Sequence, residues 1–206
     1  FADKSLINSA LRSLFLAASV ATTSTVVGTI IAIALHRYRF IGQKVVYGSL
    51  SVIMLSPEII QGISLVMIFV ILGIPLGFST LLLSHTVFCF PFVTITVLVR
   101  LKGVNRNLAE AGADLGASDV DIVRFILIPL ILPAVFAGWL MSFTLSIDDV
   151  IISFFVGGKN YEILPMKIYS MVRTGIQPDV NALCAALFFA TFAVVMLSYR
   201  LVRNRK

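Results

Sequence analysis

The chain has 206 residues, of which 59% are hydrophobic and only 13% are charged, and its mean hydropathy is +1.02. A soluble domain is closer to half apolar and a quarter charged, so this composition indicates an integral membrane protein surrounded by lipid. The net charge of +6 would suit a nucleic-acid binder, but the basic residues form short clusters between apolar segments and no stripe. Nucleic acid is therefore not expected as a partner.

Five apolar segments are long enough to cross a bilayer, which takes about 20 predominantly apolar residues. They predict an all-α membrane fold, because strands of a membrane barrel would alternate every second residue over about ten. The segments cover residues 14–35, 45–72, 81–99, 125–147 and 183–201. Phe1 is not a natural start, so we expect a sixth span upstream, which would place the amino end in the cytoplasm.

Lys and Arg residues flank the apolar segments unevenly. They gather between the first and second segments, between the third and fourth, and in the tail: Arg37, Arg39 and Lys44; Arg100, Lys102, Arg106 and Arg124; Arg200, Arg203, Arg205 and Lys206. Cytoplasmic loops of membrane proteins are enriched in these residues. The pattern predicts that all three clusters, and hence the carboxyl terminus, are cytoplasmic.

The second apolar segment contains an acid, Glu58, in the sequence "MLSPEIIQG". A charge at the centre of a membrane helix costs roughly 2.5 to 3.5 kcal/mol on insertion scales. Pro57 frees a backbone carbonyl about one turn earlier, and Gln61 shares a helix face with Glu58. We therefore expect Glu58 and Gln61 to line a substrate pathway at mid-depth; the alternative is a hydrogen-bonded acid that holds two helices together.

Residues 105–117, in the third connection, predict a short helix on the cytoplasmic surface. Apolar and small residues recur on one face at Leu108, Ala111, Gly112 and Leu115. Gly116 is placed to end this helix, and Ser118 with Asp121 resembles a capping box that begins the next one. The segment either docks another protein or lies on the membrane surface.

Two adjacent acids, Asp148 and Asp149, follow the fourth apolar segment in "LSIDDVIISFFVGG". From residue 125 the helix rises roughly 34 Å, which places the pair near the outer interface. Adjacent helix residues point about 100° apart, so we expect one acid to face a cavity and the other to cap the next segment. Asp149 is favoured for the cavity and Asp148 for the cap. Without Lys or Arg in the nearby spans, such acids suit a cationic solute.

Three further features have simpler interpretations. His85 is expected to be packed and hydrogen-bonded, since no partner is spaced for metal binding. Trp139 lies too deep for an interfacial belt, and either packs against a helix or lines the cavity. Residues 157–175 are too polar to cross the membrane. They predict an outer helix ending near Arg173, where a substrate-binding protein could dock.

The sequence "EAGADLGAS", followed by "ILIPLILPAVFAGWLMSF", resembles the EAA signature of ABC importer permeases. Glu110 and Ala111 match its first positions, Gly112 replaces the second Ala, and Gly116 matches the Gly, while Ile128–Pro129 stands where Leu-Pro is usual. With "ALHRYRF", "MLSPEI", "FCFPFV", "SFTLSIDDV" and "YEILPMKIYSMV", residues 8–197 are similar to the second membrane subunit of bacterial spermidine/putrescine importers.

This resemblance implies a type I ABC importer fold of six spans with the first absent here, built as one transmembrane domain over residues 1–206. It implies that residues 105–117 form a coupling helix, whose ATPase contacts are Glu110, Ala111, Gly112, Leu115 and Gly116. The expected partners are an ATPase subunit dimer, a second permease and a periplasmic or lipid-anchored substrate-binding protein. The expected location is the bacterial inner membrane.

The chain contains no phosphate-binding loop and none of the common catalytic motifs, so we expect it not to be an enzyme and to bind no cofactor itself. ATP and Mg²⁺ are expected in the partner ATPase. Another organic cation or a metal ion is the alternative solute. A scaffold or intramembrane protease is the alternative class, but Glu58 and an adjacent Asp pair make a poor catalytic dyad, and such a protein would not need an EAA-like loop.

Overall fold

The computed structural model describes residues 4–105, 107–158 and 161–174, and in these ranges every regular element is a helix. In chain order they are α1 (Lys4–Arg37), α2 (Gln43–Leu55), α3 (Glu58–Ile71), α4 (Phe78–Lys102), α5 (Asn107–Asp114), α6 (Asp119–Asp121), the π-helix η1 (Ile122–Leu127), α7 (Ile128–Asp148), α8 (Ile151–Val156) and α9 (Leu164–Thr174). The prediction of an all-α fold is confirmed for this part of the chain.

Among the described residues, three helices are long and apolar enough to cross a membrane, and they contain the first, third and fourth predicted spans. They cover Ser5–Arg37, Phe78–Lys102 and Asp119–Asp148. The second predicted span is not continuous: α2 and α3 are bent by 111°, so they form either one broken span or a re-entrant loop. The fifth, at residues 183–201, lies outside the described residues, so a count of five spans is not confirmed.

The break between α2 and α3 has a local cause. Pro57 has no N–H to continue the helix, and its ring pushes the preceding residue out of the α region. Ser56 accordingly adopts extended angles, with φ −69° and ψ 133°. The second apolar segment is therefore not the continuous helix that was predicted, because the effect of the proline was underestimated.

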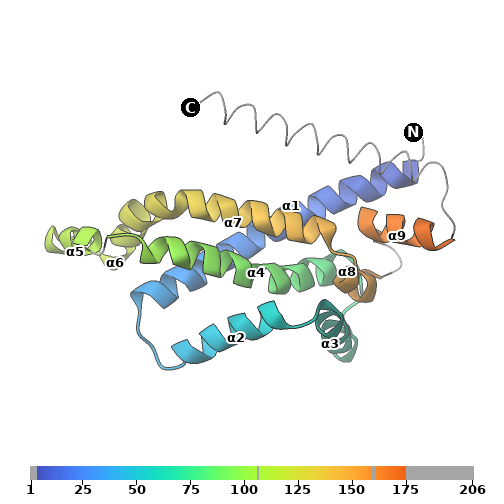
Figure 1. Cartoon of the computed structure of the whole chain (residues 1–206), viewed down its shortest axis with the longest axis horizontal. Coiled ribbons are helices and arrows are strands. Elements are labelled where there is room, and N and C mark those ends of the chain that lie inside the picture. The colour runs from blue at the N-terminus through green and yellow to red at the C-terminus, as the bar shows by residue number, and fades with distance from the viewer. Residues whose placement is uncertain (1–3, 106, 159–160, 175–206) are drawn as a thin grey trace.

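The core forms where α1, α4 and α7 run side by side, as Figure 1 shows. Small residues allow this close approach. A Cβ atom added to Gly28 of α1 would lie 2.8 Å from the Cβ of Val93, and one added to Gly138 of α7 would lie 3.0 Å from its Cγ1. Both helices therefore contact α4 at the same buried valine.

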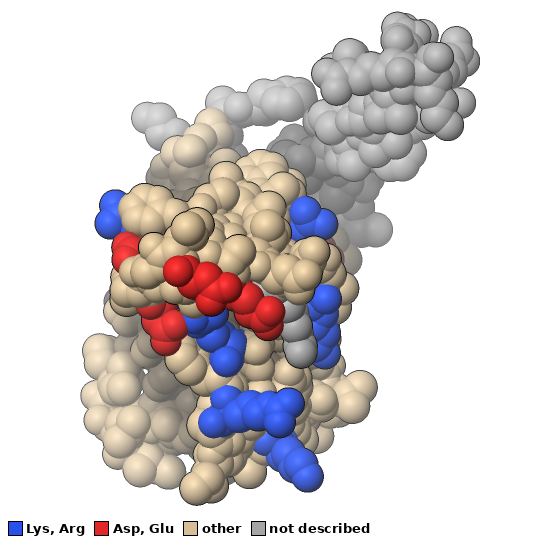
Figure 2. Space-filling view, turned by 90° about the vertical axis from the view of Figure 1, so that its left-hand side faces the viewer, with Lys and Arg blue, Asp and Glu red and all other residues tan. Residues whose placement is uncertain are grey.

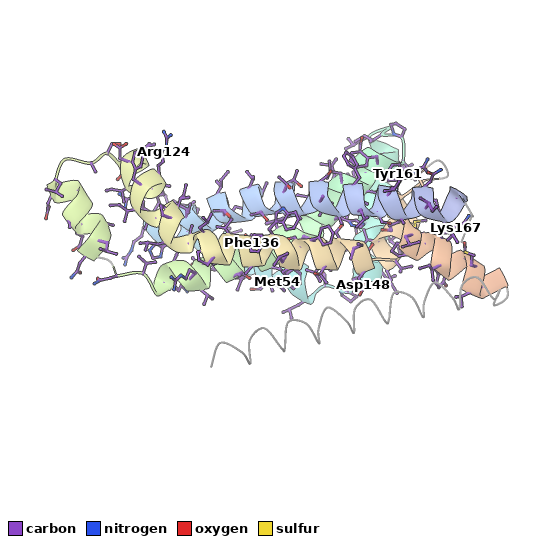
Figure 3. The ribbon with its side chains drawn as sticks, turned by 90° about the horizontal axis from the view of Figure 1, so that it is seen from above. Met54, Arg124, Phe136, Asp148, Tyr161 and Lys167 are labelled. Carbon is purple, nitrogen blue, oxygen red and sulfur yellow. The ribbon has the colours of Figure 1, made fainter. Side chains whose placement is uncertain are left out.

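The two ends of the helix bundle differ in chemistry. One end carries α5 and α6, and Figure 2 shows Lys, Arg, Asp and Glu side chains gathered on it. Arg37 and Arg39 of the first predicted basic cluster lie at this end, because they line a cavity together with residues of α5. The opposite end carries α3, α8 and α9 (Figure 1). Figure 3 shows this separation along one continuous helix, with Arg124 at one end and Asp148 at the other.

Candidate functional site

A cavity of about 290 Å³ opens between α3, α4, α7 and α8. Its lining includes three carboxylates and, among the described residues, neither Lys nor Arg. The lining residues are Glu58, Phe88, Thr144, Leu145, Asp148, Asp149, Val150 and Ile151. The structure thus brings together three of the four residues predicted for the substrate pathway, from segments about 90 positions apart in the sequence.

Asp149 is held at the beginning of α8. Its Oδ2 accepts hydrogen bonds from the backbone N–H of Ser153 at 2.9 Å and from the Ser153 hydroxyl at 2.8 Å, and its Oδ1 accepts one from the N–H of Ile152 at 3.3 Å. A carboxylate at this position satisfies free N–H groups at a helix start. Asp149 is buried, whereas Asp148 is exposed. The predicted division of roles was therefore reversed: Asp149 is the cap and Asp148 presents the freer carboxylate to the cavity.

His85 lies behind Asp149 in a fully buried polar cluster. Its Nδ1 is 2.9 Å from the Ser146 hydroxyl, and its Nε2 is 2.9 Å from the Ser153 hydroxyl and 3.3 Å from Oδ2 of Asp149. The expectation of a packed and hydrogen-bonded histidine is confirmed. The absence of Lys and Arg from the nearby spans does not leave Asp149 without a partner, because His85 from another helix contacts it.

Glu58 is the first residue of α3 and is half-buried. It was expected in the middle of a continuous span, apart from the Asp pair. Because α3 begins directly after the break at Pro57, Glu58 instead lines the same cavity as Asp148 and Asp149. A helix N-terminus stabilises a negative charge, which offsets part of the cost of placing a carboxylate there.

Gln61 does not line this cavity. Its side-chain Nε2 donates hydrogen bonds to the backbone carbonyls of Ile53 at 2.8 Å and Ser56 at 3.1 Å. In an unbroken helix the carbonyl of Ile53 would accept from the residue four positions later, and that residue is Pro57. Gln61 therefore satisfies carbonyls left free by the break. The freed carbonyl was predicted correctly, but its partner was not recognised.

Gly62 sets the distance between α3 and α8. A Cβ atom added to Gly62 would lie 2.6 Å from Cδ2 of Phe155 and 3.5 Å from the backbone Cα of Ile152. A side chain at this position would force the Phe155 ring or the two helices to shift. The contact places Glu58, one helical turn before Gly62, opposite the Asp pair. Sequence analysis did not single out Gly62, because a lone glycine in an apolar helix does not reveal its neighbour.

At the opposite end, residues 107–122 form the predicted helix and turn. Gly116 has φ +86°, its N–H donates to the carbonyl of Ala113 at 2.9 Å, and the N–H of Ala117 donates to that of Gly112 at 3.0 Å. These bonds are those of a helix end with glycine at C′. The capping box is also confirmed: Ser118 and Asp121 exchange backbone-to-side-chain bonds of 3.2 and 3.3 Å.

The residues predicted to share one face of α5 differ in their exposure to solvent. Gly112 is buried against the π-helix that begins the next span, where an added Cβ would lie 2.7 Å from Cδ1 of Ile126. Ala111 and Leu115, expected on the same face, are exposed together with Leu108 and Glu110. The small size of Gly112 thus serves contact within the chain, because η1 lies directly under α5. π-Helical turns are rare and are frequent at functional sites.

The structure also bears on the predictions for Trp139 and for the outer helix. Trp139 packs against α1: its Nε1 donates to the hydroxyl of Thr22 at 3.2 Å, and its ring stacks on Phe143 at 5.5 Å between centroids. The outer helix is present as α9, which ends at Thr174. It is held to α1 by a hydrogen bond from the N–H of Leu164 to the hydroxyl of Ser13 at 2.7 Å.

Comparison with known proteins adds to this geometry. Residues 24–205 match the family described as "Binding-protein-dependent transport system inner membrane component". The spermidine/putrescine transport system permease protein PotC of Haemophilus influenzae is 49% identical over 204 residues, which cover 99% of this chain and 79% of that protein. PotC of Escherichia coli K12 is 51% identical over 203 residues, covering 98% and 77%. The putrescine transport system permease protein PotI of the same strain is 35% identical over 207 residues, covering 97% and 74%.

Among solved structures, inward-facing MetNI, a methionine ABC transporter, aligns with a TM-score of 0.75. The alignment covers 98% of this chain and 96% of that chain, with 21% sequence identity. At this identity the likeness concerns the fold alone.

Proposed function

Because the chain belongs to the family of binding-protein-dependent transport system inner membrane components, we propose that it is the permease subunit of an ATP-driven importer for polyamines. It is a multi-pass inner-membrane permease, and the relatives that share 49% and 51% of its sequence are named for spermidine and putrescine transport. With a second permease it would form the translocation path.

One observation carries the choice of solute: the cavity presents three carboxylates and, in its described lining, no Lys or Arg. The attraction between unit charges 4 Å apart is about 1 kcal/mol in water and about 4 kcal/mol near a protein surface. Glu58 from α3 and Asp148 from α7 lie on different walls, so two ammonium groups of one polyamine could each contact a carboxylate. Asp149, whose carboxylate is hydrogen-bonded to the first turn of α8, adds a further negative charge to the cavity wall.

The partners follow from the two ends of the bundle. We propose that the exposed face of α5, with Leu108, Glu110, Ala111 and Leu115, docks an ATPase subunit of a dimer, in which ATP and Mg²⁺ are used. Gly112 and Gly116 would support this face from within, by packing and by the turn. The end with α9 would receive a periplasmic or lipid-anchored substrate-binding protein, and the carboxyl terminus would be cytoplasmic.

The test is uptake by the complete transporter in proteoliposomes, comparing putrescine, spermidine, a quaternary ammonium ion and Mn²⁺. Wild type should take up a polyamine in preference to the other two cations. Glu58→Gln should lower that uptake several-fold while the complex still assembles. Glu162→Gln removes a carboxylate at the same end but outside the cavity, where Glu162 pairs with Lys167 of α9 at 3.2 Å; binding of the substrate-binding protein is measured for both variants, so that a docking effect is told apart from a cavity effect. Equal uptake by wild type and Glu58→Gln would remove Glu58 from the pathway.

A further inference from the structure

The buried cluster around His85 joins three helices at the inner wall of the cavity. His85 lies on α4, Ser146 on α7 and Ser153 on α8, while Asp149 lies between the last two. The side chains of His85 and Asp149 are 0% and 2% exposed. A histidine in such a place usually needs every polar atom satisfied, and both ring nitrogens of His85 have partners.

The hydrogen bonds assign one proton of the ring. The Ser153 hydroxyl donates its proton to Asp149, so the Ser153 oxygen is left to accept from the imidazole. Nε2 of His85 therefore carries a hydrogen, which also points toward Oδ2 of Asp149 at 3.3 Å. In the neutral ring Nδ1 is then an acceptor, and the hydroxyl of Ser146 donates to it.

The cluster can also hold a second proton without losing a bond. If Nδ1 gains a hydrogen, it can donate to the Ser146 oxygen at the same 2.9 Å. The hydroxyl hydrogen of Ser146 can then turn toward a carbonyl one turn earlier in its own helix, as serines in helices commonly do. Both charge states of the ring are therefore compatible with one arrangement of heavy atoms.

We infer that His85 is a positioning residue for the cationic solute, which acts through Asp149. Its Nε2 fixes Asp149 and the first turn of α8, and proton gain at Nδ1 changes the His85–Asp149 pair from singly negative to neutral. The inference rests on the proposed polyamine path. When the pair is negative, the inner wall attracts an ammonium group; when it is neutral, Glu58 and Asp148 must hold the solute alone.

Among the described residues, the charged groups that line the cavity together with Asp149 are Glu58 from α3 and Asp148 from α7. From α8 the uncharged Ser153 contacts the pair. On α4 itself the nearest titratable neighbour is Cys89, one turn from His85, which is buried and contacts the carbonyl of Ser142 at 3.8 Å. Imidazole is the side chain whose charge ordinarily changes between pH 5 and pH 8.

The experiment measures KM and kcat for putrescine uptake by the complete transporter between pH 8 and pH 6. Both amines of putrescine stay protonated over this range, as simple alkylamines titrate near pH 10. Wild-type KM should rise several-fold on going to pH 6, because the loss of one negative charge at the pair weakens its attraction for the ammonium groups. His85→Gln can keep a donor to Asp149 but takes no proton, so its KM should change much less.

Thr94→Val is the matched control. Thr94 is fully buried on the same helix, but its hydroxyl bonds only to the carbonyl of Phe90 within that helix. Its KM curve should follow wild type. A curve for His85→Gln that runs parallel to wild type, whether shifted or not, overturns the inference and leaves His85 a packing residue.

Two further measurements distinguish the possible outcomes. Wild type that takes up neither putrescine nor spermidine overturns the proposed function and this inference together, whereas normal wild-type uptake with a parallel His85→Gln curve overturns only the role of His85. If His85→Gln fails to assemble, Ser146→Ala decides. It leaves the bonds of Nε2 intact and removes the acceptor that a second ring proton needs, so the rise in KM should move to lower pH. An unchanged curve for Ser146→Ala overturns the inference.

Discussion

The cytoplasmic turn and the outer cavity are both candidate sites, yet they are built in opposite ways. The turn at residues 112–121 is closed by bonds between residues no more than five positions apart. The cavity is assembled from residues between 58 and 151, which meet only because α3, α4, α7 and α8 pack together. A site made from neighbours should tolerate distant changes and fail on local backbone strain. A site made from packed helices should fail when the packing changes, even where no lining residue is touched.

The largest effect is expected from Gly62→Ala, which changes no lining residue. The new methyl would lie 2.6 Å from the ring of Phe155, so this ring must move or α3 and α8 must separate. Such overpacking costs about 1 to 3 kcal/mol. Polyamine uptake should fall at least tenfold, with a lower midpoint of thermal unfolding for the purified complex.

Gly48→Ala provides the comparison for Gly62→Ala. Gly48 lies in α2, and no atom lies within 4 Å of a Cβ added there. The same substitution should leave uptake unchanged or stabilise the helix slightly, since glycine is about 0.5 to 1 kcal/mol worse than alanine in helices. If both variants behave alike, packing of α3 against α8 does not control the cavity.

The next largest effect is expected from Gly116→Ala at the cytoplasmic turn. No atom lies within 4 Å of a Cβ added there, so the cost is purely that of φ +86°, about 1 to 2 kcal/mol for a residue with a side chain. ATP hydrolysis stimulated by the binding protein should fall several-fold, and Gly116→Val should be worse. The control is Gly103→Ala, whose φ of −86° suits any residue. Equal stimulation in Gly116→Ala and wild type would show that the turn does not transmit motion.

This comparison also explains what could be predicted from the sequence. Gly116, Ser118 and Asp121 act on neighbours, so their spacing alone was enough to predict the turn. The partner of Gln61 was missed although it is local, because a side chain that replaces a lost backbone N–H leaves no periodic pattern. The cluster of His85, Ser146 and Ser153 depends on contacts between residues more than 60 positions apart, which the order of residues does not reveal.

The two adjacent aspartates should show the two kinds of effect separately: a loss of stability at Asp149 and a loss of uptake at Asp148. Asp149→Asn weakens the cap of α8, and loss of a capping side chain costs about 0.5 to 2 kcal/mol. The thermal midpoint of the complex should therefore fall. Asp148 is exposed, so Asp148→Asn should leave that midpoint unchanged and lower uptake several-fold.

Ionic strength distinguishes the two variants further. An exposed charge is screened by salt, with a Debye length of about 8 Å at 0.15 M. The difference in uptake between wild type and Asp148→Asn should shrink at high salt, while the loss of stability in Asp149→Asn should persist. A stable Asp149→Asn and an unstable Asp148→Asn would restore the opposite division of roles.

The smallest effect is expected at the ion pair between Arg37 and Asp119, which joins the end of α1 to the start of α6 beside the turn. The side chains are 20% and 61% exposed, and exposed pairs contribute about 0 to 1 kcal/mol because water and salt screen them. A double-mutant cycle with Arg37→Gln and Asp119→Asn, read from thermal midpoints, should give a coupling in this range that vanishes at high salt. Asp114→Asn, an exposed acid at the end of α5, supplies the baseline for removing one negative charge. A coupling well above 1 kcal/mol would mean that charge contributes to this end as much as backbone geometry does. The contrast between a turn set by neighbours and a cavity set by packing would then no longer hold.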